Sequence, residues 1–206
     1  MLFDVIYKTI TTNAESICKD KGSKFIAFAF AVATEAEIKQ HLKTLKDAHA
    51  KANHHCYAWR LGAAKTNYRV NDDGEPAGSA GKPIFGVIQS HDLTNVLIVV
   101  VRYFGGTLLG IPGLINAYKT AAQQAVAQST IIEKPITEIY TLEFGYEVLN
   151  MVMPKLKQKG INILSQHFAD QNIIRFEVEK AIAQKVISEL TGNYLLKDKL
   201  VLKAVI

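Results

Sequence analysis

The sequence of 206 residues predicts an α+β protein with two domains. Apolar strands, amphipathic helices and two glycine-rich loops fill the first part of the chain, and Lys134-Pro135 then interrupts this pattern. The block that follows has the order strand, helix, strand, strand, helix, strand, which is the ferredoxin-like βαββαβ arrangement. We therefore expect one domain at residues 1–133 and a second, ferredoxin-like domain at 136–206.

The elements of the first domain follow from hydrophobic patterning and from residues that begin helices. Thr34 and Glu37 form a capping box, so a helix follows with Ile38 and Leu45 on its buried face. Pro112 fits the first turn of a later helix, because its missing N–H would have no partner there. The expected elements are strands at 3–12 and 24–32, a helix from 35, a strand at 56–61, a loop at 62–78, a short helix at 80–89, a buried strand at 94–101 and a helix from 112 to about 129.

The second domain is predicted from a shorter repeat of the same signals. Gly160 and Gly192 each end a helical pattern, and residues 170–172 form the turn of a hairpin. The expected elements are a strand at 137–144, a helix at 147–159, hairpin strands at 161–168 and 173–179, a helix at 181–190 and a last strand at 199–205.

Composition narrows the class of protein. Apolar residues make up 49% of the chain and charged residues 21%, which is ordinary for a soluble globular protein. The net charge of +5 lies mostly before Glu133, where 14 basic and 10 acidic residues give +4, and is compatible with an acidic partner. The two cysteines make no disulfide framework and the start lacks a signal peptide, so we expect a cytoplasmic location. The longest apolar run, 96–101, is too short to span a membrane, and no oligomeric state is assigned.

Two loops carry the strongest functional signal. Residues 71–83 and 102–113 combine glycines with charged side chains on either side of the buried strand. Such loops bring backbone N–H groups and cations together, as anion recognition requires. The alternatives are that the glycines serve tight packing and that Arg102 balances the acidic residues of the first loop. The candidate anion-binding residues are Lys82, Arg102, Tyr103, Gly105, Gly106, Lys119, Arg60 and Lys65.

Neither loop matches a known nucleotide-binding motif. A P-loop needs Gly at 76 and Ser or Thr at 83, where the chain has Pro76 and Pro83, and the second loop lacks the G-x-G-x-x-G spacing. Asp72, Asp73 and Glu75 form a candidate acidic site with oxygen ligands that suit Mg²⁺, although a turn with ion pairs is the favoured interpretation.

A histidine and cysteine cluster offers a second metal hypothesis. His49, His54, His55 and Cys56 lie close in sequence, but neither C-x-x-C nor H-x₃-H spacing is present. His54 and His55 are neighbours, so in a strand they face opposite sides. We therefore predict neither a metal nor a cofactor.

Three long motifs make the chain resemble the Impact/YigZ family. They read HCYAWRLG at 55–62, DDGEPAGSAGKPI at 72–84 and TNVLIVVVRYFGGTLLG at 94–110. The resemblance implies that the first domain is similar to domain 2 of ribosomal protein S5, and that the second is similar to a ferredoxin-like domain of elongation factor G. One departure is that Asn116 and Lys119 stand where the family typically has arginine and glycine.

The resemblance also implies a function. Eukaryotic members regulate translation by binding a partner of a stress kinase, and a nucleic-acid or ribosome-associated role is the usual suggestion for bacterial members. We therefore expect a protein without catalytic residues that binds RNA or the ribosome and regulates translation. The alternatives are a metal-assisted enzyme acting on a phosphorylated or nucleotide substrate, through Asp72, Asp73 and Glu75, and a pure protein-interaction module.

Overall fold

A computed structural model describes residues 5–158, 160–169, 171–193, 195–196 and 199–205. The chain forms two compact units, one of Tyr7–Lys134 and one of Met1–Ile6 with Pro135–Ile206. Of the described residues, Val5 and Ile6 therefore group with the C-terminal part of the chain. Strand β1 (Ile6–Ile10) and strand β7 (Ile131–Pro135) form a two-stranded sheet where the chain passes between the units.

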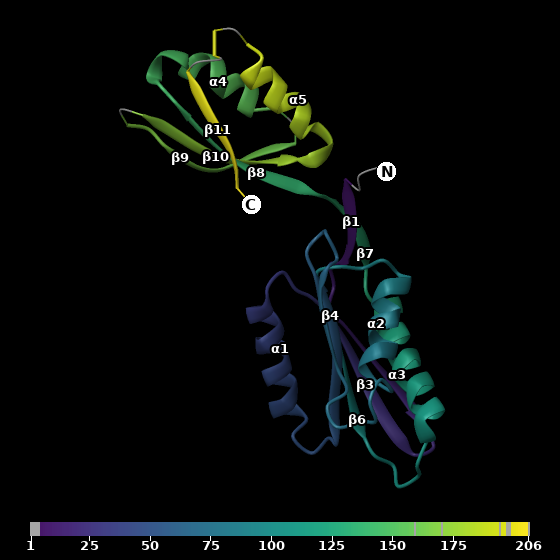
Figure 1. The fold of residues 1–206 in the computed structure, drawn as a ribbon. Coiled ribbons are helices and arrows are strands. Elements are labelled where there is room, and N and C mark those ends of the chain that lie inside the picture. Colours follow the sequence, from purple (N-terminus) through teal and green to yellow (C-terminus); the bar gives the residue numbers. More distant parts are fainter. Residues whose placement is uncertain (1–4, 159, 170, 194, 197–198, 206) are drawn as a thin grey trace. The chain divides into compact units, whose positions relative to one another are not determined.

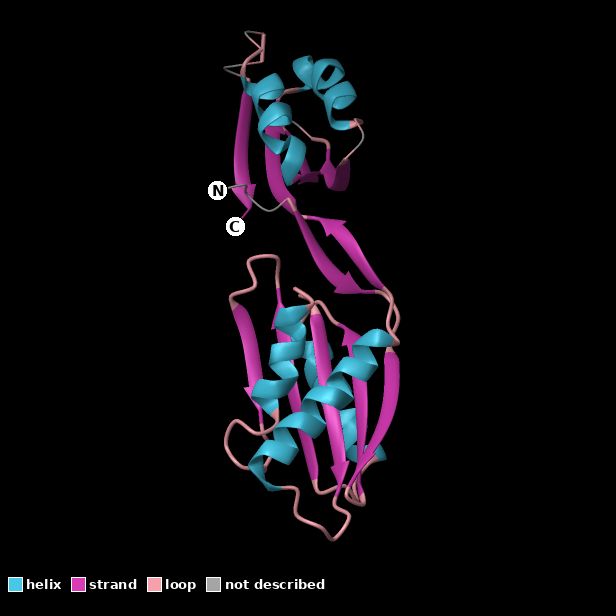
Figure 2. Cartoon of the chain, turned by 90° about the vertical axis from the view of Figure 1, so that its right-hand side faces the viewer, coloured by secondary structure: helices cyan, strands magenta, loops and turns pink. Residues whose placement is uncertain are grey.

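The unit Tyr7–Lys134 has three layers around a five-stranded antiparallel sheet with the order β2-β3-β6-β4-β5. Helix α1 covers one face, and helices α2 and α3 cover the other (Figure 1, Figure 2). The elements are β2 (Ala14–Asp20), β3 (Ser23–Ala31), α1 (Glu35–Ala48), β4 (His54–Leu61), β5 (Asn67–Asn71), α2 (Gly81–Ser90), β6 (Val96–Tyr103) and α3 (Gly110–Ala127).

Strand β6 is buried on both faces, which explains its continuous apolar sequence. Val96, Ile98 and Val100 pack beneath α2 and α3, whereas the residues between them pack beneath α1. Because side chains alternate along a strand, Arg102 and Tyr103 leave its end toward opposite faces.

Two edge strands of this sheet differ from the prediction. The sequence analysis assigned no element to the residues between 12 and 24, but Ala14–Asp20 forms β2, and Lys21 and Gly22 alone make the hairpin turn, both with positive φ. Strand β5 lies inside the predicted loop 62–78. Both strands are largely exposed, so few of their own side chains are buried. They are held in the sheet by their hydrogen-bonded pairing with β3 and β4.

The second unit has a four-stranded antiparallel sheet with the order β11-β8-β10-β9, and α4 and α5 lie on one of its faces (Figure 1). Its core joins the buried face of the sheet to both helices. The elements are β8 (Thr137–Phe144), η1 (Tyr146–Val148), α4 (Leu149–Leu156), β9 (Ile161–His167), β10 (Asn172–Glu179), α5 (Lys180–Thr191) and β11 (Leu200–Val205), in the predicted order. None of the helices in the described part of the chain is both long and apolar enough to cross a bilayer.

Candidate functional site

The acidic loop between β5 and α2 is organised around the carboxylate of Asp72. Its Oδ1 accepts hydrogen bonds from the N–H groups of Ala80 and Gly81 at 3.0 and 2.8 Å, and its Oδ2 accepts one from Gly78 at 2.8 Å. Burial acts to raise the pKa of Asp72, but these three hydrogen bonds hold the pKa below its usual range. Asp72 is therefore ionised, and its hydrogen bonds hold the loop in this conformation.

Asp73 joins the same loop to the start of β4. Its Oδ2 accepts the N–H of His55 at 2.7 Å, and its carbonyl oxygen lies 2.8 Å from Nδ1 of His54. A carbonyl oxygen only accepts, so His54 carries a proton on Nδ1. In the neutral ring, Nε2 is consequently an acceptor.

Glu75 and Arg102 form a buried ion pair at the end of β6. Nη1 of Arg102 donates to Oε1 of Glu75 at 2.6 Å, and the two side chains are only 6% and 4% exposed. The hydroxyl of Tyr118 on α3 donates to the same oxygen at 2.7 Å, and Nη2 of Arg102 donates to Oγ of Ser23 at 3.3 Å. Each charge is thus compensated inside the protein, as a buried pair requires.

Tyr118 and Cys56 extend this network into the core. Sγ of Cys56 lies 3.3 Å from the Tyr118 hydroxyl and donates to the carbonyl oxygen of Asp72 at 3.0 Å. Burial raises the pKa of Cys56 to about 12 and also raises the pKa of Tyr118. Both groups are protonated at neutral pH, so Cys56 is a thiol rather than a nucleophilic thiolate.

A pocket of about 370 Å³ lies beside the ion pair. Its polar lining is Asn53, His54, Glu75 and Arg102, and its apolar lining includes the buried residues Leu109 and Leu114. Three more apolar residues that line it are exposed: Phe104 by 44%, Leu108 by 83% and Ile111 by 55%. We call Phe104, Leu108 and Ile111 the apolar rim.

The structure directs Arg102 and Tyr103, two of the candidate anion-binding residues, to opposite faces of the sheet. Arg102 points to the α2 and α3 side, between the rings of Phe25 and Phe104, whose centroids lie 5.5 and 5.6 Å from its guanidinium carbon. Tyr103 lies on the α1 side, where its hydroxyl is 2.9 Å from Nδ1 of His49.

Arg60 and Lys65 lie at the opposite end of the sheet. Along β4, His54 pairs with Arg102, whereas Arg60 pairs with Val96 at the start of β6. The carboxylate of Asp92 lies 3.4 Å from Nη2 of Arg60 and 2.6 Å from Nζ of Lys65. A hydrogen bond from Lys65 is the main cause that lowers the pKa of Asp92.

The remaining candidates divide into two exposed lysines and two loop glycines. Lys82 begins α2 and Lys119 lies within α3, and neither forms an ion pair with a described residue. Gly105 packs directly on the backbone of Gly22, where a Cβ atom would overlap that chain. Gly106 has a φ of +85°, which favours glycine.

Internal contacts engage His49, His54, His55 and the carboxylate of Asp73. Within the described residues, no three His, Cys, Asp or Glu side chains gather as ligands for a metal ion would. His49, His54 and His55 contact Tyr103, the Asp73 carbonyl and the Asp73 carboxylate respectively.

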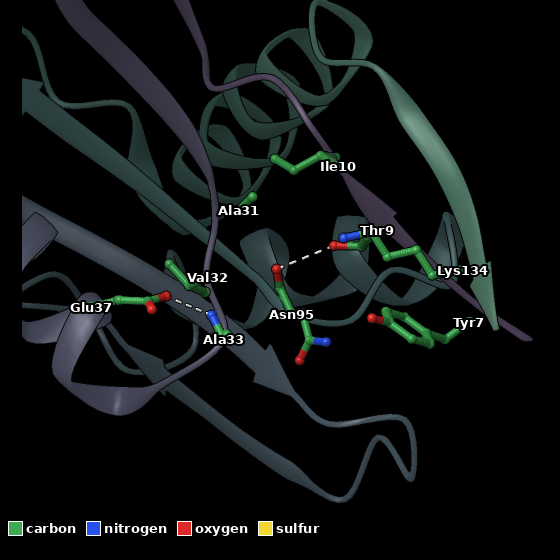
Figure 3. A pocket seen from close by; sticks show the side chains of 9 residues that line it. All are labelled: Tyr7, Thr9, Ile10, Ala31, Val32, Ala33, Glu37, Asn95 and Lys134. Carbon is green, nitrogen blue, oxygen red and sulfur yellow. Dashed lines mark hydrogen bonds between the residues drawn. The ribbon is translucent and has the colours of Figure 1, made fainter. Parts of the chain in front are cut away.

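A second, smaller cavity of about 220 Å³ lies between the start of the unit, residues 31–33 and Asn95. Figure 3 shows Tyr7, Thr9 and Asn95 around it, and the Thr9 hydroxyl donates to the carbonyl oxygen of Asn95 at 3.3 Å. Glu37 caps the N–H of Ala33 at its margin. The cavity lacks both a buried ion pair and a rim of exposed apolar residues, so the Arg102 pocket is the stronger candidate site.

The sequence analysis missed Tyr118, Ser23 and the apolar rim. A usable signal existed for Tyr118, because it lies among alanines on the buried face of a helix and a buried hydroxyl needs a partner. Ser23 had no such signal, since its contact with Arg102 joins residues 79 positions apart.

The chain is similar to known proteins of one family. Residues 21–126 match the model of the Impact N-terminal domain. The IMPACT family member YigZ of Escherichia coli is 35% identical over 164 residues, which cover 78% of this chain and 80% of that protein. The IMPACT family member YvyE of Bacillus subtilis is 30% identical over 171 residues, which cover 83% and 78%.

A solved structure has a similar fold over the whole chain. The crystal structure of a hypothetical protein superposes with a TM-score of 0.77 at 28% identity and covers 99% of both chains. The sequence motifs, the family model and the two bacterial relatives agree, so the chain belongs to the IMPACT family.

Proposed function

We propose that this protein regulates translation as a binding protein without catalytic activity, and that a protein partner docks at the Arg102 pocket. Family membership supports the role in translation, because the resemblance implies that role for eukaryotic members. The observation that carries the docking proposal is the apolar rim, three exposed side chains beside a buried ion pair. Grouped exposed apolar residues around a concavity are typical of binding surfaces.

The charges at the pocket support a protein partner over a phosphate ligand. Arg102 lines the pocket, but its guanidinium is engaged by Glu75 and Ser23. A phosphate would have to compete with the Glu75 carboxylate for this guanidinium. The protonated states of Cys56 and Tyr118 likewise support binding rather than nucleophilic catalysis.

We also propose the finer fold labels for the two units. The βαββαβ order with the sheet order β11-β8-β10-β9 supports a ferredoxin-like second unit. The family resemblance supports an S5 domain 2-like first unit.

RNA is the second candidate partner, and the two exposed lysines favour it. Lys82 and Lys119 lie on the neighbouring helices α2 and α3 and form no ion pair within 4.0 Å among the described residues, although the charge of Lys82 helps to lower the pKa of Asp72. Cations of this kind bind phosphates in a way that weakens steeply with salt.

A pull-down from cell extract, with and without nuclease, tests the two candidates. The bait is the full chain, compared with Leu108→Ser/Ile111→Ser at the rim and Lys82→Ala/Lys119→Ala on the helices. Ile17→Ser is the control, because Ile17 is 52% exposed in the same unit but does not line the pocket.

We expect captured proteins to survive nuclease and to be lost with the rim variant alone. Capture that disappears with nuclease and with the lysine variant would instead establish RNA as the partner. Rim and control variants that behave alike would refute docking at the pocket.

A further inference from the structure

Arg102 is the arginine that lines this pocket, and Glu75 compensates its charge. Nη1 and Nη2 of Arg102 are bonded to Glu75 and Ser23. Nε has no partner among the described residues, but it is fully buried. A ligand in the pocket therefore meets an arginine whose charge Glu75 already compensates, although Nη1 and Nη2 each keep one further hydrogen.

Glu75 offers the pocket an acceptor instead. Its Oε1 takes the hydrogen bonds from Arg102 and Tyr118, whereas its Oε2 has no partner in the described part of the chain. The fully buried side-chain atoms without partners in that part belong to His55, Arg102 and Asn172, so Oε2 of Glu75 keeps some contact with solvent, although the side chain is only 4% exposed. Because Glu75 lines the pocket, this oxygen is available to a ligand there.

Two neighbouring side chains complete the polar lining. Nδ1 of His54 is held as a donor to the Asp73 carbonyl, so the neutral ring presents Nε2 as an acceptor, 3.8 Å from Oε1 of Glu75. Oδ1 of Asn53 accepts the N–H of Phe104, which leaves its amide NH₂ as a donor. A peptide group supplies a donor and an acceptor that match these atoms.

We propose that the pocket binds a segment of a protein partner that places an apolar side chain against Leu109 and Leu114 and donates a hydrogen bond to Oε2 of Glu75. This inference rests on the proposed function of the same surface and adds the chemistry of recognition. An anionic segment is disfavoured, because the lining carboxylate is only neutralised by Arg102 and no unpaired lysine or arginine lines the pocket.

Two small probes with one carbon skeleton test this chemistry on the full chain. Isocaproamide carries N–H donors, and isocaproate carries a carboxylate in their place. Two-dimensional amide NMR spectra are recorded during titration with each probe. We expect isocaproamide to shift the signals of Glu75, Leu109 and Ile111 in a saturable way, and isocaproate to bind roughly tenfold more weakly or worse.

Variants place the effect at the pocket. Glu75→Gln exchanges the acceptor Oε2 for an amide group, so the preference for isocaproamide is expected to disappear. If that variant fails to fold, Ile111→Ser provides the second test. We expect it to bind isocaproamide more weakly than the Ile17→Ser control does.

Equal or tighter binding of isocaproate, or no binding of isocaproamide, overturns this inference. The result is separable from the proposed function. Loss of protein capture in the rim variant together with equal affinity for both probes would keep the docking surface and refute the donor chemistry. Probe selectivity without any captured protein would refute the proposed function alone.

Discussion

The two ends of the five-stranded sheet carry the same kind of ion pair in different surroundings. At one end, Arg102 of β6 meets Glu75, and both side chains are nearly buried. At the other end, Arg60 of β4, whose side chain is also nearly buried at 7% exposed, meets Asp92, whose side chain is 55% exposed. Tyr118 and Ser23 support the first pair from within the unit, whereas Lys65 supports the second from the surface.

The difference teaches that burial decides how much an arginine–carboxylate pair contributes to stability. A buried pair needs every partner, because removal of one charge leaves the other uncompensated in a poorly solvated place. A pair whose carboxylate is exposed is partly solvated by water and contributes less. Only the buried pair lines the pocket with the apolar rim, so it combines structural constraint with a binding surface.

The largest expected effect comes from removal of the buried carboxylate. Glu75→Ala should lower the free energy of unfolding of the first unit by about 3–5 kcal/mol, because Arg102 loses its charge partner. Trp59 is the only tryptophan and lies in this unit, so its fluorescence during urea unfolding measures the change. If Glu75→Ala lowered the free energy of unfolding no more than Asp92→Ala does, the two ends of the sheet would not differ in this way.

A smaller effect is expected from the hydroxyl that supports the buried pair. Tyr118→Phe removes the hydrogen bond to Glu75 and should cost about 1–2 kcal/mol by the same fluorescence measurement. Tyr57→Phe is the matched control, since the Tyr57 hydroxyl has no hydrogen-bond partner among the described residues and its loss should cost at most about 0.5 kcal/mol. Equal costs for the two variants would show that the hydroxyl does not support the pair.

The exposed pair should matter less. Asp92→Asn is expected to lower the free energy of unfolding by no more than about 1 kcal/mol at pH 7, because water screens the lost charge. Arg60 keeps its hydrogen bond to the carbonyl oxygen of Leu93 in this variant. A cost as large as that of Glu75→Ala would contradict the assignment of a surface role.

The smallest effect is a pH dependence of the exposed pair. The hydrogen bond from Lys65 lowers the pKa of Asp92 in the folded protein, so its contribution is present above the usual aspartate pKa of about 4 and is lost as the pH falls through the lower folded value. Urea unfolding of wild type and Asp92→Asn at neutral and acid pH should therefore show a difference that shrinks on acidification. A difference that grew instead would reverse the sign of the linkage.

Elements with a strong pattern were predictable, and edge elements were not. Helix α1 was placed by its capping box, and Thr34 does accept the N–H of Glu37 at 3.2 Å. Strand β6 was placed by its apolar run. Strands β2 and β5 escaped prediction because an edge strand needs only one buried face and one partner, so its own sequence carries a weak signal.

The site shows the same division at the level of single residues. The motifs located Glu75 and Arg102, and an ion pair between Arg102 and the acidic loop was one of the two interpretations left open. Alternation along β6 could have shown that Arg102 and Tyr103 point to opposite faces. No local pattern shows that Leu108 and Ile111 surround the same pocket as Asn53, since these residues meet only when β4, β6 and α3 come together.

The sequence by itself determined the family, the order of the strongly patterned elements and the two loops that hold the candidate site. Those features depend on residues close together in the chain, whose spacing and type decide helix, strand or turn. Only the tertiary structure decided which charges are paired, which oxygen of Glu75 lacks a hydrogen-bond partner and which lysines are exposed. Each of those outcomes depends on burial and on contacts between residues far apart in the sequence.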